Sequence, residues 1–457
     1  MTSFLGEYEA TQAKAERAQR QASRTQLLLA ERLARLDKQL KSAKEAVDAA
    51  VIVETGEDEC ADADAGQGDP RLHGCPGATE KPTHEIKRRQ RVVIAMLIRQ
   101  PPEASLYSFI GHHLALGFEC IEFFFDDIDD DGADARIMGE LRRRYKKSVR
   151  IHHCNRAWFM ELKDSSKCWD QYGEYVFQDL IARQVLAVEY GLRLSCTDGV
   201  DWLLHIDVDE LLHFDGNGST NVAKWFANVP EQADIVHFVN LEAAPERSEL
   251  SQRGSGDYFS EISLFKENPS NVSLAVLRQH WPSGKRKHYF TAYANGKSAV
   301  RCGTSHGSVV PDGSHSFRHS TPSMTGPEQT SLTCIEADSV QEGTVRLLHY
   351  PHCSMDLWQT KYELLGEFPN VWCGKDRIPE DSFHWKSRNL LSLEQNRKSN
   401  HAKADSTTWT DMNISPEQFF VDNVVFSNKE ETEKLIKVGL LVRFNNNLLF
   451  FCDEQEI

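Results

Sequence analysis

The sequence lacks a long apolar stretch. Its longest unbroken apolar run, Val92–Ile98, is far shorter than the roughly 20 residues that a membrane-spanning helix requires. Residues 1–30 also lack the basic start and apolar stretch of a secretory signal peptide. From these residues alone we expect a cytoplasmic protein.

Paired cysteines and an excess of positive charge are absent as well. The 11 cysteines are odd in number and include no Cys-x-x-Cys pair, which disfavours a structural zinc site and a fully paired disulfide framework. The 52 Lys and Arg residues are outnumbered by 68 Asp and Glu, giving a formal net charge of −16. Because an acidic chain is not drawn to phosphate backbones, we expect no nucleic-acid partner.

The first 50 residues are predicted to form a coiled-coil helix. Residues 12–47 contain no Gly or Pro, and apolar residues recur there at alternating spacings of four and three, at Leu29, Leu33, Leu36, Leu40, Ala43 and Val47. Such a seam would pair the chain with a second copy or with another partner; a solvated single helix is the alternative. Residues 51–90 are predicted to be an acidic disordered linker, because residues 54–69 carry seven acidic side chains and no basic one.

Strand and helix patterns alternate from Val92 onward. Short apolar runs suited to buried strands occupy residues 92–98, 120–125 and 202–206, and a further short strand is expected at residues 149–152. Segments with helical spacing occupy residues 103–116, 133–145 and 172–190, the last of them followed by Gly191. This order predicts an α/β domain with a largely parallel sheet over residues 91–395. We expect residues 396–457 to be a C-terminal helical extension.

Acidic residues follow two of the expected strands. Asp126 and Asp127 end one apolar run, and Asp207 and Asp209 directly follow another. Ligands of parallel sheets bind beyond the carboxyl ends of the strands, where these groups would meet. In an extended chain Asp207 and Asp209 point to the same side, which makes a hard oxygen site for Mn²⁺ or Mg²⁺ with positions left open for a substrate diphosphate. The alternative is that both are loop caps or solvated acids.

Three segments, met in this order, resemble one family of enzymes. They are residues 117–127, residues 201–211 around the Asp-x-Asp, and residues 347–350 together with Ser354, Trp358 and Lys361. The pattern is similar to the glycosyltransferase 2-like group that includes the glycosyltransferase family 92 domain, and the likeness runs from about residue 92 to 388. It implies a GT-A fold, a Rossmann-like and mostly parallel sheet with flanking helices. It also implies a nucleotide-sugar donor, usually a UDP-sugar, a carbohydrate or glycoprotein acceptor, and the Golgi lumen in place of the cytoplasm.

The resemblance also implies roles for individual residues. Asp209 would ligate Mn²⁺ (or Mg²⁺) on the diphosphate, Asp207 would contact the ribose or complete the metal site through a bound water, and His349 would be a further metal ligand. Asp126 and Asp127 would face the nucleotide, and Arg99 would reach the uridine or the phosphates. Two of these residues have plainer alternatives: His349 as a core histidine, and Asp126 as a cap of the following helix.

An inverting transferase also needs a base for the acceptor hydroxyl. Glu242 ends a predicted strand at residues 235–242 and is the candidate, with Glu246 as the alternative; a retaining enzyme would need neither. Trp158, Trp169 and Trp202 are expected either to stack on sugar rings or to pack in the core. The basic stretch at residues 285–288 and 297–301 either meets phosphates or solvates a loop.

Three functions compete on the sequence. A metal-dependent glycosyltransferase leads. A catalytically inactive scaffold acting through its coiled coil is the first alternative. A glycoside hydrolase is less favoured, because its two carboxylates must lie on either side of a glycosidic bond, roughly 5–9.5 Å apart.

Overall fold

The computed structural model describes residues 88–215, 221–250, 256–281, 288–303, 309–320, 332–340, 343–366, 368, 370–398 and 414–444. The predicted coiled coil and all but the last three residues of the predicted linker lie outside these ranges. None of the helices within them is both long enough and apolar enough to cross a membrane.

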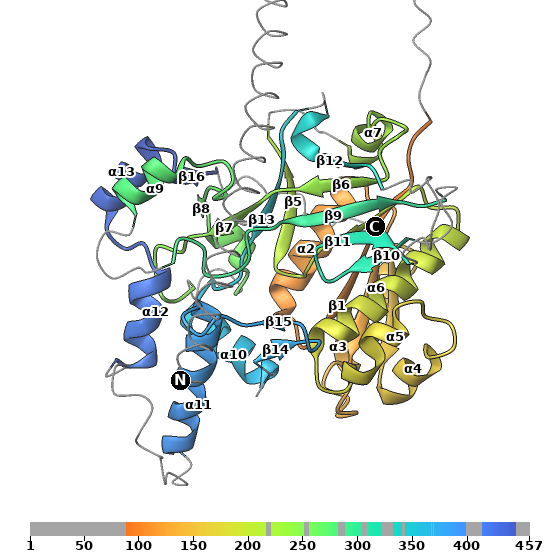
Figure 1. Ribbon diagram of the computed structural model, residues 1–457, viewed down its shortest axis with the longest axis horizontal. Coiled ribbons are helices and arrows are strands. Elements are labelled where there is room, and N and C mark those ends of the chain that lie inside the picture. The colour runs from red at the N-terminus through yellow and green to blue at the C-terminus, as the bar shows by residue number, and fades with distance from the viewer. Residues whose placement is uncertain are drawn as a thin grey trace, which may run out of the picture. The chain divides into compact units, whose positions relative to one another are not determined.

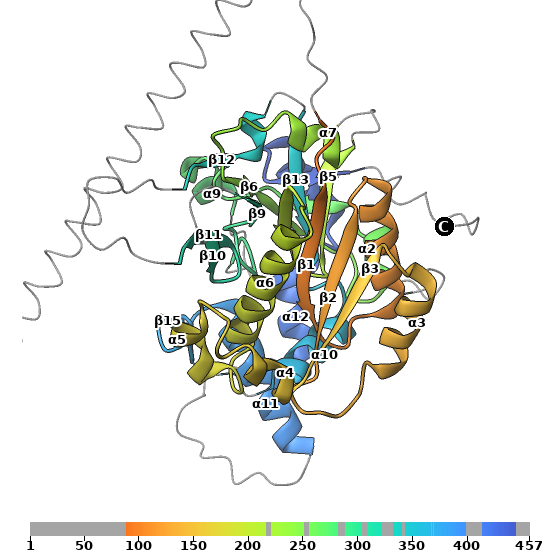
Figure 2. The same ribbon diagram turned by 90° about the vertical axis from the view of Figure 1, so that its right-hand side faces the viewer.

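A seven-stranded sheet forms the centre of the described fold (Figures 1 and 2). Strand β1 pairs in parallel with β2 and β4, β2 pairs in parallel with β3, and only β9 runs antiparallel to its neighbours β4 and β6. The strand order is β12 (Cys334–Glu336), β6 (Ile235–Phe238), β9 (Lys297–Arg301), β4 (Trp202–His205), β1 (Val92–Ile98), β2 (Cys120–Asp126), β3 (Val149–Cys154). The predicted α/β class and mostly parallel sheet are confirmed, with β1 to β4 at the four predicted strands.

Both faces of this sheet are covered, which explains the unbroken apolar run of β1. Alternate residues of β1 point into two separate cores: Val92, Ile94 and Met96 into one, and Val93, Ala95 and Leu97 into the other. The first core is closed by α2 (Glu103–Ala115), α3 (Ala135–Tyr145) and α7 (Val222–Ala227), and the second by α6 (Leu180–Thr197). Figure 2 shows α6 lying along β1 and β2.

The position of α6 corrects the prediction of a helix over residues 172–190. The helix begins at Leu180, because the Asp179 carboxylate accepts a hydrogen bond from the Ile181 N–H and caps it. Gly191 lies inside the helix and does not end it. A Cβ at Gly191 would lie 3.2 Å from both Ala95 and Phe124, so this glycine serves the close approach of helix to sheet.

A second sheet of five strands was not predicted. Its order is β16 (Leu441–Arg443), β8 (Leu264–Lys266), β7 (Asn240–Ala243), β13 (Val345–His349), β5 (Glu210–Phe214), and only β7 and β13 pair in parallel. The single strand expected at residues 235–242 is in fact two strands, β6 and β7, which Val239 separates and which belong to different sheets. The chain also crosses between the sheets through residues 206–209, which link β4 to β5.

The C-terminal helices build a third core. Trp358 and Tyr362 of α10 (Met355–Leu365) pack there with residues of α11 (Phe383–Lys398) and α12 (Pro416–Val424). The expected C-terminal extension is helical over α12 and α13 (Lys429–Lys437), and it also adds β16 to the second sheet. Figure 1 shows these segments in blue.

The remaining elements are short. They are α4 (Arg156–Glu161), α5 (Trp169–Tyr172), η1 (Gly173–Tyr175), α8 (Tyr258–Glu261), α9 (Leu274–His280), η2 (Ala337–Ser339) and the hairpins β10 (Val309–Asp312) with β11 (Ser316–His319) and β14 (Val371–Trp372) with β15 (Asp376–Arg377).

Candidate functional site

A cavity of about 710 Å³ opens where the strands β1, β2, β4 and β13 end. This volume is within the range of about 300–1,000 Å³ that is common for ligand pockets. Five of the residues singled out from the sequence line it: Arg99, Asp126, Asp207, Asp209 and His349. Arg99 and His349, which are 250 positions apart in sequence, therefore meet where strands of the two sheets end.

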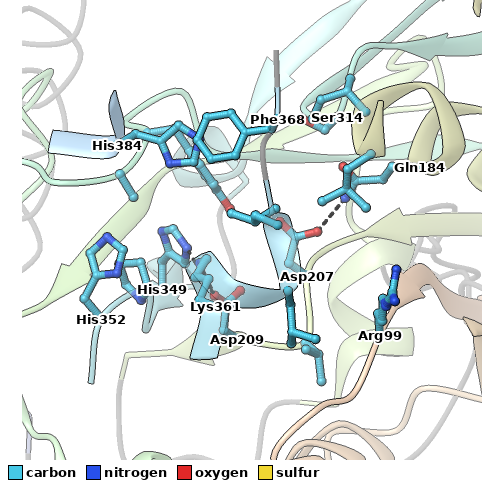
Figure 3. Close-up of a pocket in the computed structure, with 18 of the residues that line it drawn as sticks. Arg99, Gln184, Asp207, Asp209, Ser314, His349, His352, Lys361, Phe368 and His384 are labelled. Atoms are coloured by element: carbon cyan, nitrogen blue, oxygen red, sulfur yellow. Dashed lines mark hydrogen bonds and ion pairs between the residues drawn. The ribbon is translucent and has the colours of Figure 1, made fainter. Parts of the chain in front are cut away.

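Asp207 is held by two side chains at the base of this cavity. Its Oδ2 accepts a hydrogen bond from Lys297 Nζ at 2.8 Å, and its Oδ1 accepts one from Gln184 Nε2 at 2.6 Å (Figure 3). Lys297 is fully buried and also donates to the Ser314 carbonyl at 3.0 Å. Burial alone would raise the pKa of Asp207, but the adjacent ammonium outweighs it and lowers the pKa below the ordinary value. Asp207 is therefore a carboxylate at neutral pH.

Asp209 lies with a lysine and a histidine on one wall of the cavity (Figure 3). Lys361 Nζ is 3.1 Å from Asp209 Oδ2, and His349 Nε2 is 3.8 Å from the same oxygen. Each carboxylate of the Asp-x-Asp thus has a lysine of its own, although only the Lys297 ammonium is wholly buried. This wall therefore places a carboxylate, a lysine ammonium and an imidazole within reach of one small group of a ligand.

His349 is a neutral imidazole. Burial lowers its pKa to about 4, so it carries no proton charge at pH 7. Its ring stacks on Tyr293 with centroids 4.5 Å apart, and its Nδ1 is buried with no hydrogen-bond partner. The stacking fits a core histidine, whereas the neutral ring that lines the cavity near Asp209 fits a metal ligand.

Glu210 supports the Asp-x-Asp turn from below. Its Oε2 accepts a hydrogen bond from the Asp207 N–H at 2.7 Å, and its Oε1 accepts one from the Tyr293 hydroxyl. Burial, together with repulsion from Asp207 and Asp209, raises its pKa from 4.5 to about 8. Glu210 is therefore largely protonated at neutral pH.

This raised pKa predicts how stability depends on pH. Between about pH 4.5 and pH 8 the folded state holds a proton that the unfolded state has released, so the contribution of Glu210 to stability falls as the pH rises. Glu210→Gln cannot lose that proton. We expect the melting temperature of the variant to rise relative to that of the parent from pH 5 to pH 8, measured by thermal unfolding across the series. A difference that stays constant over the series would contradict the assignment.

Arg99 and Asp126 lie at the ends of β1 and β2. Asp126 Oδ2 accepts a hydrogen bond from Arg183 Nε of α6 at 3.0 Å in a buried ion pair, while Asp126 Oδ1 has no hydrogen-bond partner. Arg99 donates to Asp129 at 2.7 Å and keeps part of its side chain exposed at the cavity.

Asp127, which follows Asp126, does not line the cavity. It accepts hydrogen bonds from His153 and from the N–H groups of Asp131 and Gly132. It organises the loop after β2.

Glu242 is also outside the cavity wall. It is completely buried, forms an ion pair with Lys266 at 2.5 Å, and accepts hydrogen bonds from the N–H groups of Thr291 and Ala292. These contacts occupy both oxygens and hold the loop that brings Tyr293 to His349. The alternative, Glu246, pairs with Arg443 on the surface. The structure thus places Glu242 behind the cavity wall, where its contacts anchor the loop at residues 291–292.

The tryptophans and the basic stretch singled out from the sequence do not form a group at the cavity. Trp158, Trp169 and Trp202 pack against the cores and none of them lines the cavity. Residues 285–287 lie outside the described ranges, and Lys297 is a buried partner of Asp207 instead of a loop cation. Gln184, Tyr293 and Glu210 were not assigned from the sequence; the quoted motif did contain Glu210, but only its contacts reveal its function.

A divalent cation in this cavity would need carboxylate or imidazole donors. Within the described ranges, no group of three or more His, Cys, Asp or Glu side chains is arranged to hold a metal ion. Asp209 Oδ2 and His349 Nε2 lie 3.8 Å apart and offer a carboxylate and a neutral imidazole to a cation, but the same oxygen accepts a hydrogen bond from Lys361, which a bound cation would have to displace. Both oxygens of Asp207 are already engaged, so this residue fits a supporting position better than direct ligation.

Part of the chain is similar in sequence to known proteins. No family model matches the chain. A glycosyltransferase-like protein of Arabidopsis thaliana is 32% identical over 244 residues, covering 52% of this chain and 51% of the relative. A second Arabidopsis protein, also named glycosyltransferase-like, is 29% identical over 143 residues, covering 31% and 26%. The chain spans about half the length of the first relative and about a quarter of the second, and it is a distant homologue of plant glycosyltransferase-like proteins over that part.

Proposed function

We propose that the protein is a glycosyltransferase that uses a nucleotide-sugar donor, with UDP-sugars as the first class to examine. One observation carries the proposal: the Asp207–Asp209 turn lies at the carboxyl end of a parallel strand, in a cavity that is also lined by four Lys and Arg side chains, from the end of β1 and from α6, α10 and β15. Distant homology to glycosyltransferase-like proteins supports the same class. The donor, the acceptor and the need for a metal are parts of the proposal.

The cations are placed to meet a diphosphate. Lys361 extends from α10 beside Asp209, and Arg99 extends from the end of β1. Transfer of the sugar leaves negative charge on the departing diphosphate, and cations fixed beforehand around it stabilise that charge. Asp126 and Arg183 line the part of the cavity between β2 and α6, where we assign the nucleoside.

We assign Asp209 and His349 as the residues that would hold Mn²⁺ or Mg²⁺, with Asp207 in support. A bound cation would add further charge compensation for the diphosphate. The proposal gives Glu242 the task of holding the cavity wall, so no base is assigned to it.

The alternatives fit the cavity less well. A glycoside hydrolase needs one carboxylic acid that is protonated near neutral pH. Burial raises the pKa of Asp126, but this carboxylate is paired with Arg183, and Asp207 and Asp209 are each paired with a lysine. An inactive scaffold is expected to bind neither UDP nor Mn²⁺, which the following experiment measures.

Thermal unfolding with UDP tests the proposal. We expect UDP to raise the melting temperature of the full-length protein, and Mn²⁺ to increase that rise, because a ligand bound only by the folded state stabilises it. AMP at the same concentration is the control for phosphate binding in general. If UDP causes no shift in melting temperature, with or without Mn²⁺, the proposal of a UDP-sugar enzyme is wrong. If UDP causes a shift that Mn²⁺ does not change, only the proposed metal dependence is wrong.

A further inference from the structure

The wall of the cavity that faces the Asp-x-Asp turn is aromatic. Phe368, Trp372 and His384 all line the cavity, and Figure 3 shows Phe368 and His384 side by side across from Asp209. The Phe368 and Trp372 rings are stacked, with centroids 5.2 Å apart and planes 18° apart. His384 stacks on Phe368 at 4.5 Å and 19°. Trp372 and His384 are themselves 6.1 Å apart and tilted by 36°, so the three rings form one compact aromatic cluster around Phe368.

This aromatic wall is held rigidly from two sides. The Asp179 carboxylate, which caps α6, also accepts a hydrogen bond from the Cys373 N–H at 2.6 Å. Arg388 of α11 donates to the Phe368 carbonyl at 2.7 Å, and its guanidinium lies 4.8 Å from the centre of the Phe368 ring. Tyr362 fixes the His384 ring through a hydrogen bond of 2.9 Å. A surface fixed in this way meets a ligand without first having to be ordered.

Two of these three rings are partly accessible from the cavity. Phe368 is buried in the C-terminal core, but Trp372 and His384 remain partly exposed at the cavity. Two polar residues close to these rings also line the cavity: Arg377, on the strand paired with that of Trp372, and Ser382, two residues before His384. A partly exposed aromatic ring with polar neighbours suits a ligand ring that has an apolar face and a polar edge, as a pyranose does.

We infer that this aromatic wall is the acceptor subsite and that the acceptor presents a pyranose ring, stacked on Trp372 opposite the donor diphosphate. The assignment rests on the proposed function, which supplies the donor end of the same cavity. It explains why the cavity continues past the charged wall of Asp209 and Lys361 as far as α11. It also specifies a saccharide acceptor, and not a peptide side chain alone.

Binding of simple sugars to the full-length protein in the presence of UDP tests this inference. The probes are the methyl glycosides of glucose, galactose, mannose and N-acetylglucosamine, followed by saturation-transfer NMR. We expect at least one of them to bind the parent, and Trp372→Ala to weaken that binding about tenfold. Trp372→Phe should restore most of the affinity, because a flat ring is retained.

Trp385→Ala is the matched control. Trp385 is partly buried and packs against the same C-terminal core, but it does not line the cavity. We expect this variant to bind the glycoside as the parent does, and Trp372→Ala to retain the melting-temperature rise caused by UDP. The inference is overturned if no glycoside binds the parent, if Trp372→Ala binds it as tightly as the parent, or if both tryptophan variants lose binding equally. Failure of UDP to bind the parent is a separate result that overturns the proposed function.

Discussion

Replacing Lys297 with Met should lower the free energy of unfolding by about 3 kcal/mol. Lys297 is fully buried, and its ammonium donates to Asp207 at 2.8 Å and to the Ser314 carbonyl at 3.0 Å. Met fills a similar volume but leaves the Asp207 carboxylate without its cation and the carbonyl without its donor. Denaturant unfolding of parent and variant measures the loss.

A double substitution separates charge from packing. Asp207→Asn combined with Lys297→Met removes both charges, and we expect it to recover about half of the lost stability. Lys224→Met is the surface control, because Lys224 is exposed on α7 and its replacement should change stability by less than about 0.5 kcal/mol. If Lys297→Met unfolds like the control, the buried ion pair is not the support of the Asp-x-Asp turn.

Replacing Asp209 with Asn should reduce turnover of the nucleotide-sugar donor by about a hundredfold or more. Asp209 faces the cavity beside Lys361 and His349, so its carboxylate serves the ligand end of the site and not a core. For the same reason we expect the melting temperature without ligand to change little. Release of UDP from a UDP-sugar measures the turnover, and titration with Mn²⁺ in the presence of UDP measures the affinity for the metal.

The exposed Asp164 provides the matched control, with Asp164→Asn expected to behave as the parent does in both measurements. Unchanged turnover and unchanged Mn²⁺ dependence of UDP binding in Asp209→Asn would refute the assignment of Asp209. A large loss of stability in the ligand-free variant would instead identify Asp209 as a structural residue.

The parallel part of the fold was predictable mainly because β1, β2 and β4 are largely apolar and buried on both faces, whereas β3 is more polar and only partly buried. The run at β1 has the predicted bounds, and the acids after β2 and β4 gave the position of the cavity. The second sheet was not predictable in the same way. Its strands are short, from three to five residues, and β6 and β7 form one apolar pattern although Val239 separates them.

The partners within the site escaped prediction for a different reason. Asp207 and Lys297 are 90 positions apart, and no local pattern indicates that a lysine in a basic stretch turns inward to meet an acid. Glu242 shows the converse. It stands at the end of a strand, as a catalytic carboxylate would, yet Lys266 and the backbone of Thr291 use its oxygens. Only the tertiary contacts distinguish an anchor from a base.

The two sheets are joined covalently at two short links, one through Val239 and one through residues 206–209 that contain the Asp-x-Asp. Within each sheet one strand lies between the two that are linked: β9 between β4 and β6, and β13 between β5 and β7. Two links that are separated in this way resist rotation of one sheet against the other more than a single link would. The Asp-x-Asp turn is thus a covalent connection between the sheets as well as part of the candidate site. Such a rotation would separate Asp207, which is bonded to Lys297 of β9, from Asp209, which lies beside His349 of β13.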